Sequence, residues 1–148
     1  MSRMITTDLS GIEVLQERLA ELLQAGEGSI EAMGNFIARS TAIRAKNLIA
    51  APGRSGRTYF REDPDRFVVA SAPGESPLDD TGALKRSITF KLFNTSGMVG
   101  YVGSDSPYAG DLEYGSDTIA ARPFLQPAFL DALEAGKGRF KAELDSRL

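Results

Sequence analysis

The chain contains no cysteine and no histidine among its 148 residues. Without cysteine it can form no disulfide, no thiolate zinc site and no cysteine nucleophile. Without histidine it lacks the usual general base near neutral pH and the commonest transition-metal ligand. These two absences exclude many familiar catalytic and metal-binding arrangements. We therefore predict a protein that is not an enzyme, with no catalytic residues, no metal and no cofactor.

The sequence also has little net charge and no long apolar run. The formal net charge is -3, with both signs spread along the chain, so no overall basic field attracts nucleic acid. No segment has the length of a membrane span, and the first eight residues lack the apolar core of a signal peptide. We expect one domain over residues 1–148, without a membrane partner and made in a cytoplasm.

Two acidic clusters are the remaining candidates for chemistry, namely Glu62, Asp63 and Asp65, and then Asp79 and Asp80. A calcium loop of the EF-hand pattern is absent, as are the glycine-rich loops that hold phosphates. Acidic residues just before a helical turn usually cap it. We expect capping or solvated-loop roles here, although a glycosidase-like carboxylate pair stays open because spatial separation cannot be read from sequence.

Apolar spacing predicts two helices in the first part of the chain. The first begins at Ser10 and should end at Gly26, and the second runs from Ser29 to about residue 51, where Pro52 stops it. Residues 52–80 are rich in proline and glycine and contain one short strand at 67–71. We interpret 52–80 as a long arm, because structureless loops of this length are uncommon inside compact domains.

The second half of the chain predicts a small sheet followed by helices. One helical turn at 81–86 precedes a hairpin, whose strands at 88–92 and 98–102 are joined by a turn at 94–97. A helix over 107–114 follows, capped by Ser106 and stopped by Gly115. The last helix should start near Pro127, because a proline further inside it would clash. The fold class is α+β: N-terminal helices over 1–51, the arm, and a small antiparallel sheet with a C-terminal helix packed on it over 81–148.

Arginine and aromatic residues alternate in the arm, where Arg54, Arg57, Arg61 and Arg66 surround Tyr59 and Phe60. This composition suits single-stranded nucleic acid, through stacking and phosphate contacts. It also suits a contact between subunits. The interleaved acidic residues cancel most of the local charge and favour the protein contact.

A second polar feature is Arg122, whose guanidinium could reach Glu113 at the end of the preceding helix. A free, solvated arginine is the equal alternative. If the pair forms, it would fix the angle between two helices or bridge two subunits, and it would contribute at most about 1 kcal/mol in water.

Four sequence blocks occur in an order and spacing that resemble a known family. They are Pro73-Gly-Glu-Ser-Pro77, Asp80-Thr-Gly-Ala-Leu-Lys-Arg-Ser-Ile88, Leu112-Glu-Tyr-Gly115 with the preceding Tyr108-Ala, and Ala121-Arg-Pro-Phe-Leu-Gln-Pro-Ala128. The succession covers about residues 52–130. It resembles the tailed-phage tail-component family typified by the gene-10 product of a lambdoid coliphage, and is similar to the minor tail protein Z, or tail-completion, group. Some relatives have threonine at Ser116 and arginine at Gln126, which are mild departures.

The resemblance implies a structural virion protein of the phage neck, at the head–tail junction. Such proteins are expected as homo-oligomeric rings, commonly six-fold, that join the head to the tail or terminate the tail around the DNA channel. Implied partners are neighbouring neck, tail-tube or head-completion proteins, while DNA passes through the lumen without specific binding. The alternative function is a nucleic-acid-binding module that uses the Arg54–Arg66 arm.

A ring needs two different contact patches on each subunit. We assign these to the arm at 52–80 and to the segment 107–130. The expected interface residues are Arg54, Arg57, Tyr59, Phe60, Arg61, Tyr108, Glu113, Tyr114, Arg122 and Phe124.

Overall fold

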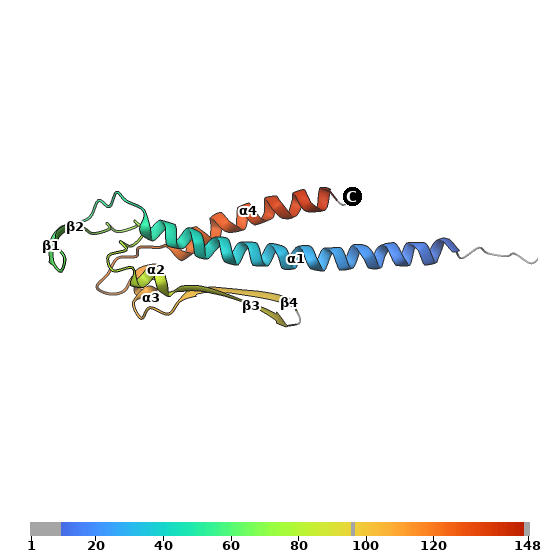
Figure 1. Cartoon of the computed structure of the whole chain (residues 1–148), viewed down its shortest axis with the longest axis horizontal. Coiled ribbons are helices and arrows are strands. Elements are labelled where there is room, and N and C mark those ends of the chain that lie inside the picture. The colour runs from blue at the N-terminus through green and yellow to red at the C-terminus, as the bar shows by residue number, and fades with distance from the viewer. Residues whose placement is uncertain (1–9, 96, 147–148) are drawn as a thin grey trace, which may run out of the picture.

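The computed structural model describes residues 10–95 and 97–146 and confirms the α+β class. Helix α1 lies between α4 and the β3–β4 hairpin, as Figure 1 shows. In chain order the elements are α1 (Ser10–Ala50), β1 (Thr58–Glu62), β2 (Asp65–Val69), α2 (Ala83–Ser87), β3 (Ile88–Thr95), β4 (Gly97–Ser104), α3 (Ala109–Tyr114) and α4 (Leu125–Asp145).

Helix α1 is continuous, so the predicted break at Gly26 is wrong. A glycine ends a helix by adopting a positive φ, and Gly26 is not among the glycines that do so. Its immediate neighbours, Ala25 and Glu27, are good helix formers, and a break would leave backbone groups of both ends without partners. The C-terminal end of α1 at Ala50, just before Pro52, agrees with the prediction.

Helix α4 packs along the C-terminal half of α1. Ser29 donates a hydrogen bond to Glu143 Oε1 at 3.2 Å, and the guanidinium of Arg139 lies 4.5 Å from the centre of the Phe36 ring. Gly136 is buried against Ile37, whose Cγ1 would lie only 2.7 Å from a Cβ at the glycine. The glycine therefore allows the two helices to approach closely.

The β3–β4 hairpin forms in the predicted region, with register from Ile88 opposite Ser104 to Thr95 opposite Gly97. It packs on α1, and the main core lies where α1, the hairpin and the first turns of α4 meet. The core residues are Ala42, Ala45, Ile49, Leu84, Ile88, Ala109, Phe124 and Ala128. The C-terminal helix thus reaches the strands through its first turns.

The arm differs from the prediction, because it contains two strands where the sequence predicted one. Strands β1 and β2 form an antiparallel hairpin around Asp63-Pro64, a cis peptide bond, with Phe60 opposite Phe67. Figure 1 shows this hairpin at one end of the molecule, beyond the C-terminal end of α1. The two hairpins form separate two-stranded sheets.

Candidate subunit interface

The carboxylate of Glu113, at the end of α3, caps the first turn of α4. Glu113 Oε2 accepts the backbone N–H groups of Phe124 and Leu125 at 2.8 and 2.9 Å, and Oε1 accepts that of Gln126 at 2.7 Å. Pro127 follows and has no N–H. The first four backbone positions of a helix lack partners within the helix, and here three are bound by one buried side chain while the fourth has nothing to donate.

This cap also explains why α4 begins at Leu125 and not near Pro127 as predicted. Proline is harmful inside a helix because it lacks a hydrogen-bond donor and clashes with the preceding turn. Pro127 is the third residue of α4. At this position no backbone donor is needed and no earlier helical turn is present to clash with the ring. The negative carboxylate lies at the positive end of the helix dipole, which adds a favourable interaction. Glu113 is therefore a structural residue within the chain.

Arg122 fits neither sequence-based expectation, since it is neither paired with Glu113 nor free. Its Nε donates to the carbonyl oxygen of Ser71 at 3.2 Å and links the α3–α4 connection to the arm. Phe124 is fully buried in the core of its own chain. Glu113 and Phe124 thus hold this chain together, and both are buried within it.

Arg54 ties the root of the arm to the end of α1. Its Nη2 lies 2.7 Å and 3.2 Å from the carbonyl oxygens of Leu48 and Ile49, and 3.0 Å from that of Pro77. The last carbonyl groups of a helix have no partner within the helix, and arginine near this end can bind them. Arg54, too, has an internal structural role.

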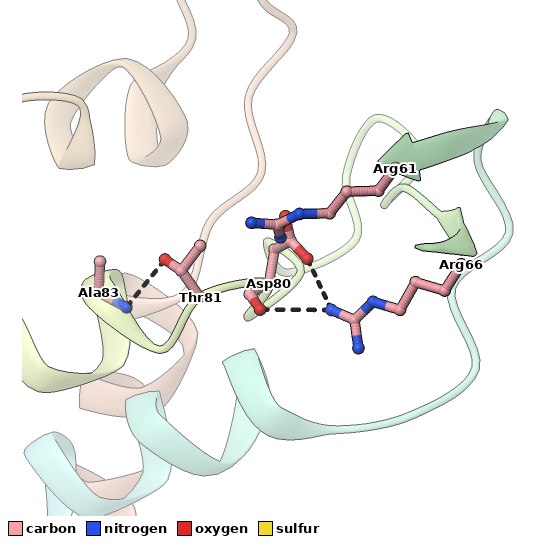
Figure 2. A network of polar contacts seen from close by, with 5 residues as sticks. All are labelled: Arg61, Arg66, Asp80, Thr81 and Ala83. Carbon is pink, nitrogen blue, oxygen red and sulfur yellow. Dashed lines mark hydrogen bonds and ion pairs between the residues drawn. The ribbon is translucent and has the colours of Figure 1, made fainter. Parts of the chain in front are cut away.

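The inward face of the β1–β2 hairpin is held by Asp80. Alternate residues of a strand point to opposite faces, which places Arg61 and Arg66, an opposite pair in the register, on one side. Both form ion pairs with Asp80, that of Arg66 at 2.9 Å (Figure 2). Asp80 does not cap α2, because the backbone N–H of Ala83, at the start of that helix, donates its hydrogen bond to the Thr81 hydroxyl.

Two carboxyl groups in this region have pKa values below their ordinary range. The Arg61 hydrogen bond, with help from Arg66, lowers the pKa of Asp80 despite partial desolvation. The same hydrogen bond raises the pKa of Arg61. The Ser55 hydroxyl and the backbone N–H groups of Ala72 and Ser55 lower the pKa of Glu75. Ionised carboxylates therefore join separate segments of the arm to each other at two points.

The outward face of the hairpin carries its two phenylalanines. Phe60 and Phe67 lie edge to face with ring centroids 5.3 Å apart, and both are exposed. We call these two residues the phenylalanine pair. Phe60 is among the predicted interface residues, whereas Phe67 is not. The sequence predicts a strand at Phe67-Val-Val. The alternation along this strand indicates that Phe67 is exposed only when the partner strand, β1, is known.

The three predicted tyrosines lie at two surface depressions. Tyr59, Tyr108 and Arg122 line one of about 410 Å³ between the arm and α3. Tyr114 lies at a second, which we call the aromatic groove, with a volume of about 480 Å³. It is lined by Thr41, Gly100, Tyr101, Val102, Glu113, Tyr114, Leu125, Gln126 and Phe129. Arg57 is exposed and its side chain makes no hydrogen bond or ion pair with another described residue.

Sequence reasoning missed one further exposed surface. Residues 16–24 of α1 are all exposed, including Leu19, Leu22 and Leu23. Figure 1 shows that this part of α1, which we call the overhang, extends beyond both α4 and the β3–β4 hairpin. The leucine spacing is visible in the sequence, but it predicts a helix face packed within the chain.

Within residues 10–95 and 97–146, no three acidic side chains come together in a way that could hold a metal ion. Over the same ranges, no helix is both long and apolar enough to cross a membrane. No family model matches the sequence, and no curated protein or solved structure is similar enough to it to count as a match.

Proposed function

We propose that this protein is a structural component of a phage neck or tail end, and that it works as a homo-oligomeric ring at the head–tail junction. The proposal combines the family resemblance over residues 52–130 with one structural observation. That observation is the overhang, where nine consecutive helical residues, 16–24, are all exposed.

An unpacked helix of this kind needs a partner. Most helical stability in proteins comes from packing an apolar face, and short isolated helices are marginal in water. The overhang exposes Leu19, Leu22 and Leu23 along one side. Contiguous exposed apolar surface of this kind usually marks an interaction site. A ring of identical subunits supplies a neighbour for every copy of the overhang.

The alternative, binding of nucleic acid through the arm, has less support. Arg54 is bound to backbone carbonyl groups, and Arg61 and Arg66 are bound to Asp80. Phosphate affinity depends on the number of cations that can neutralise phosphates. Of the arm's arginines, Arg57 alone has a side chain without a described partner.

Removal of the gene from the phage or prophage that encodes it tests the proposal. We expect DNA-filled heads and free tails that fail to join, or tails of uncontrolled length, in electron micrographs. Restoring the wild-type gene from a plasmid should restore joined particles. Normal infectious particles after deletion would refute the proposal. Salt-dependent DNA affinity that falls when Arg57 is replaced would favour the alternative.

A further inference from the structure

We propose that the phenylalanine pair of one copy inserts into the aromatic groove of a neighbouring copy, and that this is the repeating contact of the ring. The inference rests on the proposed function, which supplies the neighbouring copy. Both surfaces belong to the same chain but to different parts of it, so the contact is heterologous. Repetition of a heterologous contact closes into a ring when the rotation permits.

The orientation of the phenylalanine pair is fixed by contacts on the opposite face of the hairpin. Arg61 and Arg66 anchor the inward face of the hairpin to Asp80, and Val68 on that face is buried. Because strand residues alternate between faces, Phe60 and Phe67 must then point away from the body of the protein. Figure 2 shows both arginines reaching from the two strands to the same aspartate. The anchoring also opposes any folding back of the pair onto its own chain.

The groove has the size and lining that two phenyl rings require. Its volume is about 480 Å³, and a cavity of roughly 150 Å³ is enough for one benzene ring. Two of its polar side chains are already bound, since Glu113 accepts three backbone N–H groups and the Thr41 hydroxyl donates to the carbonyl of Ile37. Tyr101, Tyr114 and Phe129 bring aromatic surface to it from β4, α3 and α4.

The area is a substantial share of a stable interface. Phe60 and Phe67 are 53% and 76% exposed, while Tyr101, Tyr114 and Phe129 are 53%, 83% and 44% exposed. Because an aromatic side chain can bury roughly 200 Å², these five residues leave about 600 Å² in water. Specific interfaces bury about 1,600 Å² in total. The five aromatic residues would form the centre of such an interface, with other contacts around them.

Charge at the edges of the two surfaces is complementary. Glu62 and Asp65 lie opposite each other on the outward face of the hairpin, beside the phenylalanine pair. On the groove side, Lys91 lies opposite Tyr101 in the β3–β4 register and is exposed. None of these three side chains forms an ion pair with a described residue. Insertion would bring the two carboxylates towards the lysine, which favours a second copy of this chain over an uncharged partner.

Thiol cross-linking tests the contact directly, because the chain has no cysteine of its own. Phe67→Cys and Tyr114→Cys are made as separate proteins, mixed, and treated with a short bis-maleimide reagent. We expect a cross-linked dimer in the mixture and little in either protein alone. Tyr108→Cys, an exposed tyrosine outside the groove, replaces Tyr114→Cys as the control. Equal cross-linking with the control, or efficient linking of Phe67→Cys to itself, would overturn the proposal.

Two neighbouring residues of α4 provide a second, matched test. Phe129 lines the groove and Leu130 does not, although both are largely exposed. We expect Phe129→Ser to weaken self-association at least about tenfold in sedimentation equilibrium, and Leu130→Ser to change it little. Lys91→Glu should weaken self-association as well. Adding Glu62→Lys and Asp65→Lys to the Lys91→Glu variant should restore self-association.

The outcomes separate this inference from the proposed function. Rings that form normally with Phe129→Ser, and that do not cross-link between positions 67 and 114, would overturn the groove contact while leaving the ring intact. A protein that never self-associates, and whose deletion leaves normal particles, would overturn both. Folding of each variant is checked by circular dichroism, so that loss of association is not loss of structure.

Discussion

Glu113 Oε2 accepts the backbone N–H of Phe124 at 2.8 Å, and the ring of the same phenylalanine is fully buried in the core. One side chain at the end of α3 thus fixes both where α4 begins and where its first core residue lies. The carboxylate lies under the surface with all its hydrogen bonds directed at the next helix. Changes at Glu113 should therefore affect stability before they affect assembly.

Replacement of Glu113 should destabilise the isolated subunit. Glu113→Gln retains one acceptor oxygen but places an amide donor near backbone N–H groups, and we expect a loss of about 2 kcal/mol in the free energy of unfolding. Glu113→Ala should cost about 3 kcal/mol, because three N–H groups lose their partner. Urea denaturation measures both. Glu134→Gln, which breaks only an exposed pair with Lys137, is the control and should cost less than about 0.5 kcal/mol.

The anchoring of the arm should depend on acid pH. The pKa of Asp80 is lowered in the folded chain, so its ionised form stabilises the fold above the unfolded pKa of about 3.9. That contribution is lost as the pH falls from this value through the lowered folded pKa. The difference in melting temperature between wild type and Asp80→Asn should therefore be constant between about pH 5 and 7 and shrink below about pH 4. A difference that grew on acidification would show that the ion pairs do not stabilise the arm.

Two glycines of α4 should respond in opposite ways to alanine. A methyl group at Gly138 would have nothing within 4 Å of it, so Gly138→Ala should stabilise the helix by about 0.5–1 kcal/mol. Gly136→Ala gains the same helix propensity, but its methyl group would clash with the side chain of Ile37. We expect a net loss of about 1–2 kcal/mol, because the packed helices must separate. Thermal unfolding of the two variants compares them, and equal effects would mean that α1 and α4 are not closely packed there.

The overhang should matter for assembly and not for the stability of the subunit. Leu19 and Leu23 lie one helical turn apart and are 59% and 64% exposed. Replacing both by glutamine should change the free energy of unfolding by less than about 0.5 kcal/mol per residue, yet reduce ring formation in native mass spectrometry. Ala20→Gln, an exposed position between them, is the control. Rings unaffected by the leucine changes would remove the overhang from the set of subunit contacts.

Local sequence signals predict a large part of the fold. Strict alternation around Phe90 and the turn near Gly97 predict the β3–β4 hairpin, and Pro52 correctly predicts the end of α1. Gly115 is expected just beyond α3, and it has φ +81° there. Each of these signals lies within a few residues of the structure that it specifies. They can therefore be read without knowledge of the tertiary fold.

The errors arise where partners are distant or where signals compete. The cap by Glu113 joins residues 11 to 13 positions apart, so the rule that proline starts a helix places α4 two residues late. Gly26 resembles a helix stop, although its immediate neighbours Ala25 and Glu27 are strong helix formers. Asp80 resembles a local cap, because its true partners, Arg61 and Arg66, are brought to it only by the β1–β2 hairpin. The family membership, the ring and the virion role stay predictions.

The unbroken course of α1 has a mechanical consequence. Forty-one helical residues span about 60 Å at 1.5 Å per residue, and the hairpin that carries Phe60 is attached at the far end. Because the helix is stiff, a small tilt at the end that carries Leu19, Leu22 and Leu23 would displace the phenylalanine pair at the other end. This displacement would be several times larger than the movement of the leucines. In the proposed ring, neighbours that contact opposite ends of α1 would therefore influence each other's orientation.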